Sequence, residues 1–200
     1  MKEEITITAT DLFLNLGFKS VTMDDIANKM GISKKTIYAH FPNKSKLVEA
    51  TTFYLLETID KGIEEIRKKE LNAIVELFEI KKFVMHHLKD EKSSPQFQLN
   101  KYYPKIYEDV QKHHLHTMHC SVAENLQKGI EGGYYRASIP IDFISKFYFA
   151  GMMSIKNNDL FPVTKYSMRE LTEKYLEYHL RAIVTQKGLK KLKEFLTIED

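Results

Sequence analysis

A short segment of the chain combines lysine, hydroxyl and imidazole side chains in a pattern that suits contact with DNA. Residues 34–40 read Lys-Lys-Thr-Ile-Tyr-Ala-His. If this segment is a helix with Ile37 and the following Phe41 turned inward, the other side chains form an outer face. Lysines attract phosphates by charge, whereas hydroxyl and imidazole groups make shorter, oriented hydrogen bonds. These residue types at this spacing indicate a surface that binds nucleic acid.

A second cluster of side chains suggests metal chemistry. Residues 113–120 read His-His-Leu-His-Thr-Met-His-Cys. On a helix, His113 and His116 share a face, and Cys120 follows one turn later. Ligands from one helix seldom complete a tetrahedral site without help from elsewhere. We therefore expect ordinary, partly exposed histidines here, with no metal and no cofactor, and a metal site is the alternative.

Residue patterns typical of enzymes are missing from the sequence. It contains no phosphate-cradling glycine loop, no serine elbow and no zinc-protease motif. Carboxylates recur at spacings typical of solvated helix faces. The sequence therefore does not indicate an enzyme.

The composition is that of an ordinary globular protein. Of the 200 residues, 43% are hydrophobic, which is enough for a proper core. The net charge of +3 permits a nucleic-acid partner without arguing for one. Cys120 is the single cysteine, so a reducing compartment is the simple interpretation. With no signal peptide and no apolar run of membrane-spanning length, we expect a soluble, cytoplasmic protein that does not enter membranes.

Helix start and stop signals are dense around the lysine-rich segment. A first helix with apolar residues at helical spacing ends at Gly17. Thr22 and Asp25 form a capping box that starts a second helix, and Gly31 ends it. Ser33 then caps the third helix, which carries the outer face described above. Two capped helices around one glycine hold a fixed mutual angle, as a groove-reading element requires.

The rest of the chain is also predicted to be helical, with a polar loop at residues 89–98. Apolar periodicity and turn residues predict helices at about residues 43–69, 71–88, 104–132, 141–157 and 167–188, and a final basic amphipathic segment at 189–196. Strand-like alternation is hard to find. The fold class predicted is all-α.

The N-terminal fifty residues resemble the DNA-binding domain of the tetracycline-repressor (TetR) family. The resemblance rests on the first helix, the Gly17-Phe18 turn, and the segments 22–27 (TMDDIA), 31–33 (GIS), 36–38 (TIY) and 40–44 (HFPNK). It implies a three-helix, helix-turn-helix DNA-binding domain over residues 1–46. It also implies a helical regulatory domain over residues 47–200 that binds a ligand and dimerises.

The family pattern also implies roles for single residues on double-stranded DNA. Phosphates would be contacted by Thr22, Thr36, Tyr38, His40 and Lys44. Lys34 and Lys35 would be candidates for base edges, guanine acceptors above all, and Ala39 would lie against a thymine methyl group. The plain alternative is a capped three-helix bundle whose lysines only face solvent.

Aromatic and methionine side chains beyond residue 70 are candidates to line a ligand pocket. Aromatic rings and flexible methionines suit a hydrophobic ligand, although most of these residues would serve as core. The candidates are Phe78, Phe83, Met85, His86, Phe97, Tyr102, Tyr103, Tyr107, Met118 and Met152.

The predicted helix at 141–157 carries more apolar surface than one buried stripe requires. The family resemblance implies that it dimerises together with the 167–188 helix, so we expect an isologous interface that places two recognition helices about one DNA turn apart. The candidates are Phe143, Phe147, Tyr148, Gly151, Tyr175, His179 and Ala182. The alternative is a helix that is simply central in its own domain.

The sequence thus predicts a ligand-responsive transcriptional regulator. We expect a repressor that binds a palindromic operator as a homodimer and is released by a small hydrophobic effector. The alternative is a DNA-binding regulator that is controlled by a protein partner or that has no small-molecule effector.

Overall fold

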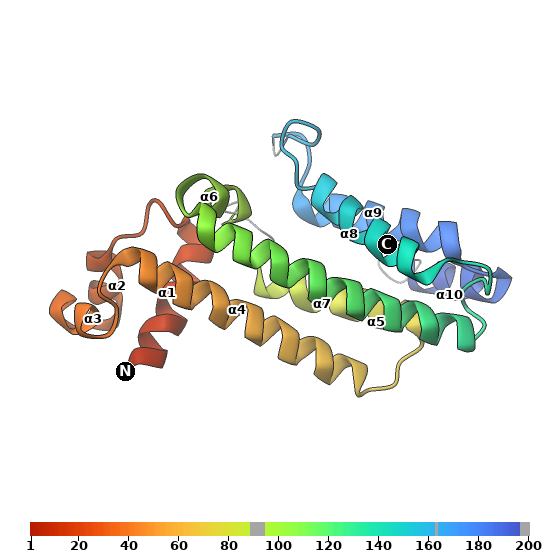
Figure 1. Cartoon of the computed structure of the whole chain (residues 1–200), viewed down its shortest axis with the longest axis horizontal. Helices are drawn as coiled ribbons and strands as arrows, with labels where there is room; N and C mark the ends of the chain where they lie inside the picture. Colours follow the sequence, from red (N-terminus) through yellow and green to blue (C-terminus); the bar gives the residue numbers. More distant parts are fainter. Residues whose placement is uncertain (89–94, 163, 197–200) are drawn as a thin grey trace. The chain divides into compact units, whose positions relative to one another are not determined.

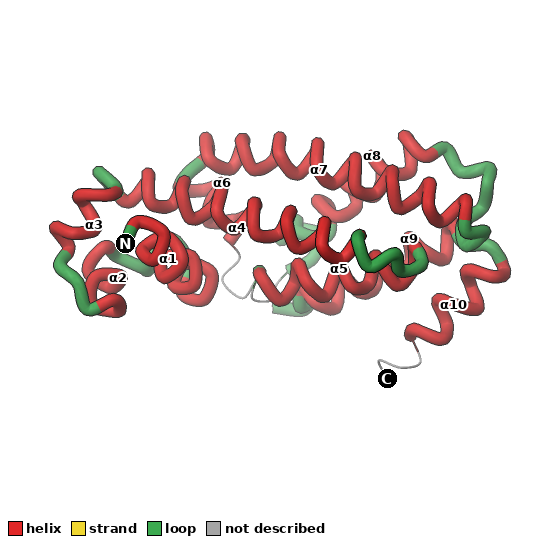
Figure 2. Tube along the Cα trace, turned by 90° about the horizontal axis from the view of Figure 1, so that it is seen from below, coloured by secondary structure: helices red, strands yellow, loops and turns green. Residues whose placement is uncertain are grey.

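The computed structural model describes residues 1–88, 95–162 and 164–196, and within them every regular element is a helix (Figures 1 and 2). The predicted all-α fold is confirmed. The helices are α1 (Lys2–Leu16), α2 (Met23–Met30), α3 (Lys34–His40), α4 (Lys44–Arg67), α5 (Ala73–His87), α6 (Pro95–Tyr102), α7 (Pro104–Glu131), α8 (Ile141–Ser154), α9 (Met168–Ile183) and α10 (Gln186–Leu196). None of these described helices combines the length and apolarity needed to span a bilayer.

The chain folds into two compact units. The first unit contains residues 1–62 and 85–113, and the second contains residues 63–84 and 114–200. Helices α4, α5 and α7 each run through both units. Residues far apart in the chain thus build the same unit. The predicted division into a DNA-binding domain (residues 1–46) and a regulatory domain (residues 47–200) stays a prediction.

Helices α1 to α3 surround the core of the first unit. Its centre is made of fully buried apolar side chains: Ile5, Ala9, Ile26, Ile37, Leu47 and Val48. Each comes from a position that the helical period places on an inner face. Leu99 of α6 joins this core, and Tyr103 and Tyr107 pack against it. The helix-turn-helix thus shares its core with a segment fifty residues further along.

Helix α6 was not expected, since residues 89–98 were predicted to form a loop. Residues 89–94 lie outside the described residues, and the loop prediction there stays a prediction. From Pro95 onward the chain is helical. Proline suits the first turn of a helix, because the N–H it lacks would have had no helical partner. The helix has only eight residues, and its stability comes from packing Leu99 into the core rather than from a local signal.

The second unit is built from parts of α5 and α7 together with α8, α9 and α10. Leu126, Leu176 and Leu180 are fully buried at its centre, and Phe195 of α10 stacks on Phe78 of α5 at a centroid distance of 4.4 Å. The apolar face of the basic C-terminal segment is thus covered, and its lysines remain outside.

The predicted helix at 167–188 is in fact two helices. Helix α9 ends at Ile183, and Val184 is extended with φ −70° and ψ 152°. Two backbone bonds hold the break: Arg136 N–H donates to the Ile183 carbonyl, and Thr185 N–H donates to the Tyr134 carbonyl, both at 2.9 Å. These partners lie about fifty residues earlier in the chain, so the helical periodicity of this segment gave no sign of the interruption.

A buried polar network joins α5 to α7 in the second unit. Glu76 is buried and accepts hydrogen bonds from Asn125 at 2.8 Å and from the Lys128 ammonium. The Tyr135 hydroxyl donates to Asn125 Oδ1 at 3.1 Å, and burial raises the pKa of Tyr135 well above its usual range. A buried carboxylate with both a cation and an amide partner is satisfied. The role of this network is therefore to hold α5 against α7.

His179 of α9 should make the second unit less stable at acidic pH. The side chain is 5% exposed, its ring lies 4.7 Å from that of Tyr148, and its Nε2 has no hydrogen-bond partner within the described part of the chain. Burial lowers the pKa of His179 from 6.5 to about 4. Between these values only the unfolded chain binds this proton. The free energy of unfolding should therefore fall with decreasing pH by up to about 1.4 kcal/mol per pH unit.

Chemical denaturation between pH 7 and pH 4 measures this effect. A His179→Phe variant should lose that part of the pH dependence, whereas His86→Phe, at an exposed histidine, should keep it. Equal pH profiles for the two variants would contradict the assignment.

Candidate nucleic-acid interface

Helix α2 begins and ends as the sequence predicts. The Thr22 hydroxyl accepts a hydrogen bond from Asp25 N–H at 3.2 Å, and Asp25 Oδ2 accepts one from Thr22 N–H at 2.7 Å. The hydrogen bonds that the Thr22 N–H and the Thr22 hydroxyl donate to the carboxylate lower the pKa of Asp25. Gly31 ends the helix in the left-handed conformation, with φ 65° and ψ 28°. A side chain with a Cβ would be strained there, so the glycine sets the turn toward α3.

Helix α3 presents the outer face that the residue pattern predicts. Ser33 caps it and accepts a hydrogen bond from Thr36 N–H at 3.1 Å. Ile37 and Phe41 are buried, which fixes the rotation of the helix about its axis. The exposed side chains are consequently Lys34, Lys35, Tyr38, Ala39 and His40, with Thr36 half-buried beside them.

Three of the residues predicted to contact phosphates also have partners inside the protein. The Thr22 hydroxyl lies 2.7 Å from Asp25 Oδ2, and the Thr36 hydroxyl lies 2.9 Å from Ser33 Oγ. Lys44 is half-buried: its Nζ donates to the Lys19 carbonyl at 3.4 Å and lies 5.9 Å from the centroid of the Phe13 ring. Burial lowers the pKa of Lys44. Lys44 therefore also supports the turn between α1 and α2, a role that the sequence did not reveal.

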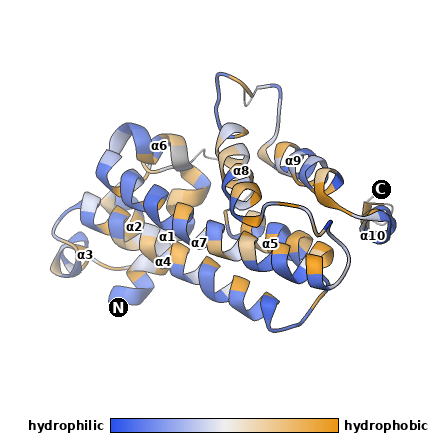
Figure 3. Cartoon of the chain, turned by 45° about the vertical axis from the view of Figure 1, so that its right-hand side comes forward, coloured by the Kyte–Doolittle hydropathy of each residue, from blue (hydrophilic) through white to orange (hydrophobic). Residues whose placement is uncertain are grey.

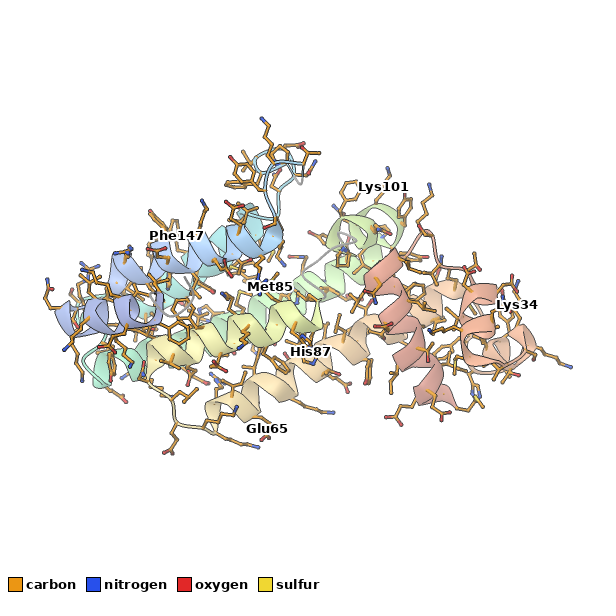
Figure 4. The ribbon with its side chains drawn as sticks, turned by 180° about the vertical axis from the view of Figure 1, so that it is seen from behind. Lys34, Glu65, Met85, His87, Lys101 and Phe147 are labelled. Carbon is orange, nitrogen blue, oxygen red and sulfur yellow. The ribbon has the colours of Figure 1, made fainter. Side chains whose placement is uncertain are left out.

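Lys34 forms an ion pair across the helix-turn-helix. Its Nζ lies 2.7 Å from Oδ2 of Asp24 in α2, and both side chains are exposed (Figure 4 labels Lys34). The hydrogen bond to Asp24 raises the pKa of Lys34. Lys35, one residue further along α3, has no ion pair among the described residues. The two neighbouring lysines therefore differ in charge compensation. Asp24 was not among the predicted interface residues, since a spacing of ten residues across a turn carries no local signal.

The turn between α1 and α2 is held from the side by α6. Gln98 Oε1 accepts a hydrogen bond from Lys19 N–H at 3.1 Å. The rings of Phe18 and Tyr103 meet edge to face at 6.3 Å. Gly17 makes the close approach possible: its φ is 87°, and a Cβ there would lie 2.5 Å from Gln98 Nε2. The start of α2, with Thr22 and Asp24, is positioned by this contact.

Replacing Gly17 with alanine should destabilise the protein. The backbone conformation, with φ 87° and ψ 151°, is one that only glycine adopts readily, and the added methyl group displaces Gln98. We expect a loss of about 2 kcal/mol or more in the free energy of unfolding. The double variant Gly17→Ala/Gln98→Ala keeps the backbone strain but has no clash. The losses in the free energy of unfolding of the two single variants should therefore add up to more than the loss in the double variant. Denaturant titrations of the four proteins check this, and strict additivity would argue against the contact.

The N-terminal segment of the chain matches a known family. Residues 5–51 match the model of the family described as bacterial regulatory proteins, tetR family. The N-terminal segment of the chain thus matches the TetR family. The matched residues span α1, α2, α3 and the first two turns of α4, the same elements that build and support the exposed face. The family that this segment matches consists of regulatory proteins rather than enzymes.

Curated relatives that the chain resembles are transcriptional regulators. YerO of Bacillus subtilis, an HTH-type transcriptional regulator, is 28% identical over 140 residues, which are 64% of this chain and 48% of YerO. The chain spans about half or less of the length of the first curated relatives it matches.

Solved structures share the fold across nearly the whole chain. A transcriptional regulator from Cytophaga hutchinsonii has a TM-score of 0.74 at 18% identity, with 92% of this chain and 98% of that one covered. SmeT, titled the repressor of a Stenotrophomonas maltophilia efflux pump, has in its triclosan complex a TM-score of 0.66 at 13% identity, with 92% of each chain covered. At these identities the likeness establishes the fold alone.

The predicted pocket residues fall into both units. Phe78, Phe83, Met118 and Met152 belong to the second unit, and Phe78 is part of its core. Met85, His86, Phe97, Tyr102, Tyr103 and Tyr107 belong to the first unit. There Tyr103 and Tyr107 pack against the helix-turn-helix core, whereas His86 and Phe97 are exposed. The structure thus does not gather these residues within one unit, and the pocket stays a prediction.

The predicted dimerisation residues differ in exposure. Phe143 and Phe147 of α8 are 61% and 54% exposed, and their rings stack at 5.9 Å. Ala182 is exposed, and Tyr148, Gly151 and Tyr175 are half-buried. The Tyr175 hydroxyl donates to the Tyr148 carbonyl at 3.0 Å. His179 is buried within the protomer between α8 and α9, because both Tyr148 and Tyr175 contact its ring. Hydrophobic residues recur along α8 and α9 in Figure 3.

The histidine-rich part of α7 forms separate polar contacts. His113 Nε2 lies 2.8 Å from Asp60 Oδ2, and His119 Nε2 lies 3.2 Å from Asp142 Oδ1. Cys120 is exposed. Among the described residues no three potential ligands gather around a point where a metal ion would fit. The metal alternative therefore has no support from the arrangement of these side chains.

Proposed function

We propose that this TetR-family protein is a transcriptional repressor that binds a palindromic operator as a homodimer and is released by a small hydrophobic effector. The observation that carries the proposal is the outer face of α3. It combines exposed lysine, tyrosine and histidine side chains on a helix whose axis and rotation are fixed by two caps and a buried Ile37. Such a helix fits the major groove, where base edges differ from pair to pair.

On DNA, contacts to phosphates and contacts to bases have different consequences. Thr22, Thr36, Tyr38, His40 and Lys44 are proposed to bind phosphates, which fixes the register of α3 without reading the sequence. Lys34 and Lys35 are proposed to reach guanine acceptors, and Ala39 a thymine methyl group. All eight side chains lie on α3 or at the starts of α2 and α4.

The homodimer is proposed to form through α8 and α9. Two stacked phenylalanines and the 67% exposed Tyr178 leave more apolar surface uncovered on these helices than a lone protomer favours. A two-fold copy of the same surface would cover it, since an isologous interface is self-complementary.

Release by an effector is proposed as a population shift. The effector must bind the conformation that does not match DNA more tightly than the one that does. SmeT, whose fold this chain shares, is known in complex with triclosan, a small hydrophobic molecule. The aromatic and methionine side chains of the predicted pocket have the same chemical character.

Selection of duplexes from a random pool tests the proposal. The protein should enrich two inverted half-sites with centres about 10 base pairs, or a multiple of that, apart. A panel of hydrophobic compounds that includes triclosan should then contain members that weaken binding to the enriched duplex. Enrichment of no sequence would overturn the DNA-binding role, whereas an enriched palindrome with no responsive compound would favour control by a protein partner.

A further inference from the structure

The ion pair between Asp24 and Lys34 presents a hydrogen-bond acceptor beside a hydrogen-bond donor on the face that carries the recognition helix. The two side chains come from the first turn of α2 and the first turn of α3, and their Oδ2 and Nζ atoms are 2.7 Å apart. Both are exposed, with 60% and 45% of their side-chain surface accessible. Exposed pairs of this kind contribute little to stability, so stability does not account for the arrangement.

The spacing of the pair matches one edge of a base pair. In the major groove a cytosine–guanine pair shows the N4 donor of cytosine next to the O6 acceptor of guanine. These two atoms are joined by a Watson–Crick hydrogen bond, so they are about 2.9 Å apart. A carboxylate oxygen and an ammonium nitrogen 2.7 Å apart therefore fit that edge, with each group opposite its complement.

The pair keeps its own hydrogen bond while it binds the base edge. The Lys34 ammonium has three N–H donors, and each Asp24 carboxylate oxygen has two lone pairs. One donor and one lone pair are used between the two side chains. The remaining donors and lone pairs are available to a base edge, so binding does not require a charged group to be left unpaired.

The chemistry also distinguishes this base pair from an adenine–thymine pair. Guanine places a second acceptor, N7, beside O6, where the ammonium has donors left. Thymine places a methyl group beside its O4 acceptor, and adenine places the N7 acceptor beside its N6 donor. The thymine methyl group would obstruct the Lys34 ammonium, and the adenine N7 acceptor would repel the Asp24 carboxylate.

We infer that Asp24 and Lys34 act together as one specificity-determining unit that reads a cytosine–guanine base pair in each half-site. The inference rests on the proposed function, since it requires that α3 enters the major groove. It adds Asp24 to the interface and gives Lys34, already proposed to reach a guanine acceptor, a partner that reads the cytosine of the same base pair. Because its charge is compensated by Asp24, Lys34 contributes little general attraction to phosphates.

The experiment measures base preference with the full chain and a random duplex pool. Wild type should enrich a motif with an invariant cytosine–guanine pair in each half-site. Asp24→Ala and Lys34→Met should each reduce the preference for that base pair about tenfold and leave the preferences elsewhere in the motif unchanged. Asp11→Ala on α1 and Lys29→Met on α2 make the same chemical changes at other exposed side chains, and they should leave the motif unchanged.

Salt dependence separates base reading from phosphate binding. Lys34→Met should leave the slope of log K against log salt concentration nearly unchanged on the enriched duplex. Asp24→Ala leaves the lysine charge uncompensated, so it should strengthen binding to unrelated duplexes and steepen the slope by up to about one.

Two results would overturn the inference while leaving the proposed function intact. One is a wild-type motif that neither substitution alters. The other is uniform weakening of all duplexes by Lys34→Met with a slope lower by about one, as a phosphate contact would produce. If wild type enriches no sequence at all, the proposed function itself has failed. Both variants retain the capping box of Thr22 and Asp25, so we expect them to fold. Thermal unfolding of each variant checks this.

Discussion

Replacing both Tyr38 and His40 with alanine should weaken binding to the preferred duplex by about tenfold to a hundredfold. Each side chain is exposed on the outer face of α3, and each is proposed to donate a hydrogen bond to a phosphate. A hydrogen bond contributes about 0.5–1.5 kcal/mol, and somewhat more when its partner is charged. Because phosphates carry no sequence information, binding to unrelated duplexes should weaken by a similar factor. Titration of a labelled duplex measures both affinities.

The control for this substitution uses the same residue types away from the interface. Tyr166 and His86 are exposed and lie outside α3. The double variant Tyr166→Ala/His86→Ala should bind DNA as wild type does. Unchanged DNA binding by the Tyr38/His40 variant, with its fold intact, would remove both residues from the interface.

A glutamate in place of Phe147 should dissociate the proposed homodimer. Phe147 is 54% exposed on the protomer and stacks on Phe143, so the change costs the lone protomer little (Figure 4 labels Phe147). In a dimer formed through α8, the new carboxylate would be buried beside apolar rings without a cation, which costs several kcal/mol. We expect the dissociation constant of the dimer to rise at least about a hundredfold. Sedimentation velocity over a range of protein concentrations measures it.

Loss of the dimer should also weaken DNA binding. Two linked half-site contacts bind about a hundredfold or more tightly than one, so Phe147→Glu should weaken binding to an inverted repeat far more than binding to a single half-site. Phe97→Glu is the matched control, because Phe97 is 60% exposed on α6. A dimer that survives Phe147→Glu would show that α8 is not at the interface.

The sequence was sufficient where the determining contacts are local. The capping box at Thr22, the left-handed Gly31 and the serine cap at Ser33 each involve residues within three or four positions of one another. Their geometry follows from short-range hydrogen bonds and backbone sterics. The same local signals, together with helical periodicity, placed Ile37 inside and therefore the lysines and Tyr38 outside.

The sequence was insufficient where a segment depends on distant partners. Helix α6 was predicted to be a loop at its start, and the 167–188 helix was predicted to be continuous. In the first case Leu99 is stabilised by the core of α1 to α3, and in the second Val184 and its neighbours bond to residues 134–136. Packing and hydrogen bonds of this range override the local helical pattern.

The sequence by itself determined the resemblance of the first fifty residues to the TetR family, the all-helical fold and the side chains exposed on α3, because caps and periodicity act over one or two turns. The tertiary structure alone decided which of those side chains have partners. It brings Gln98 to the backbone of Lys19, 79 positions away, and Asp24 to Lys34 across the turn. Side chains ten or eighty residues apart meet only after the helices have packed, and for that reason the ion pair proposed to read a base pair was absent from the sequence pattern.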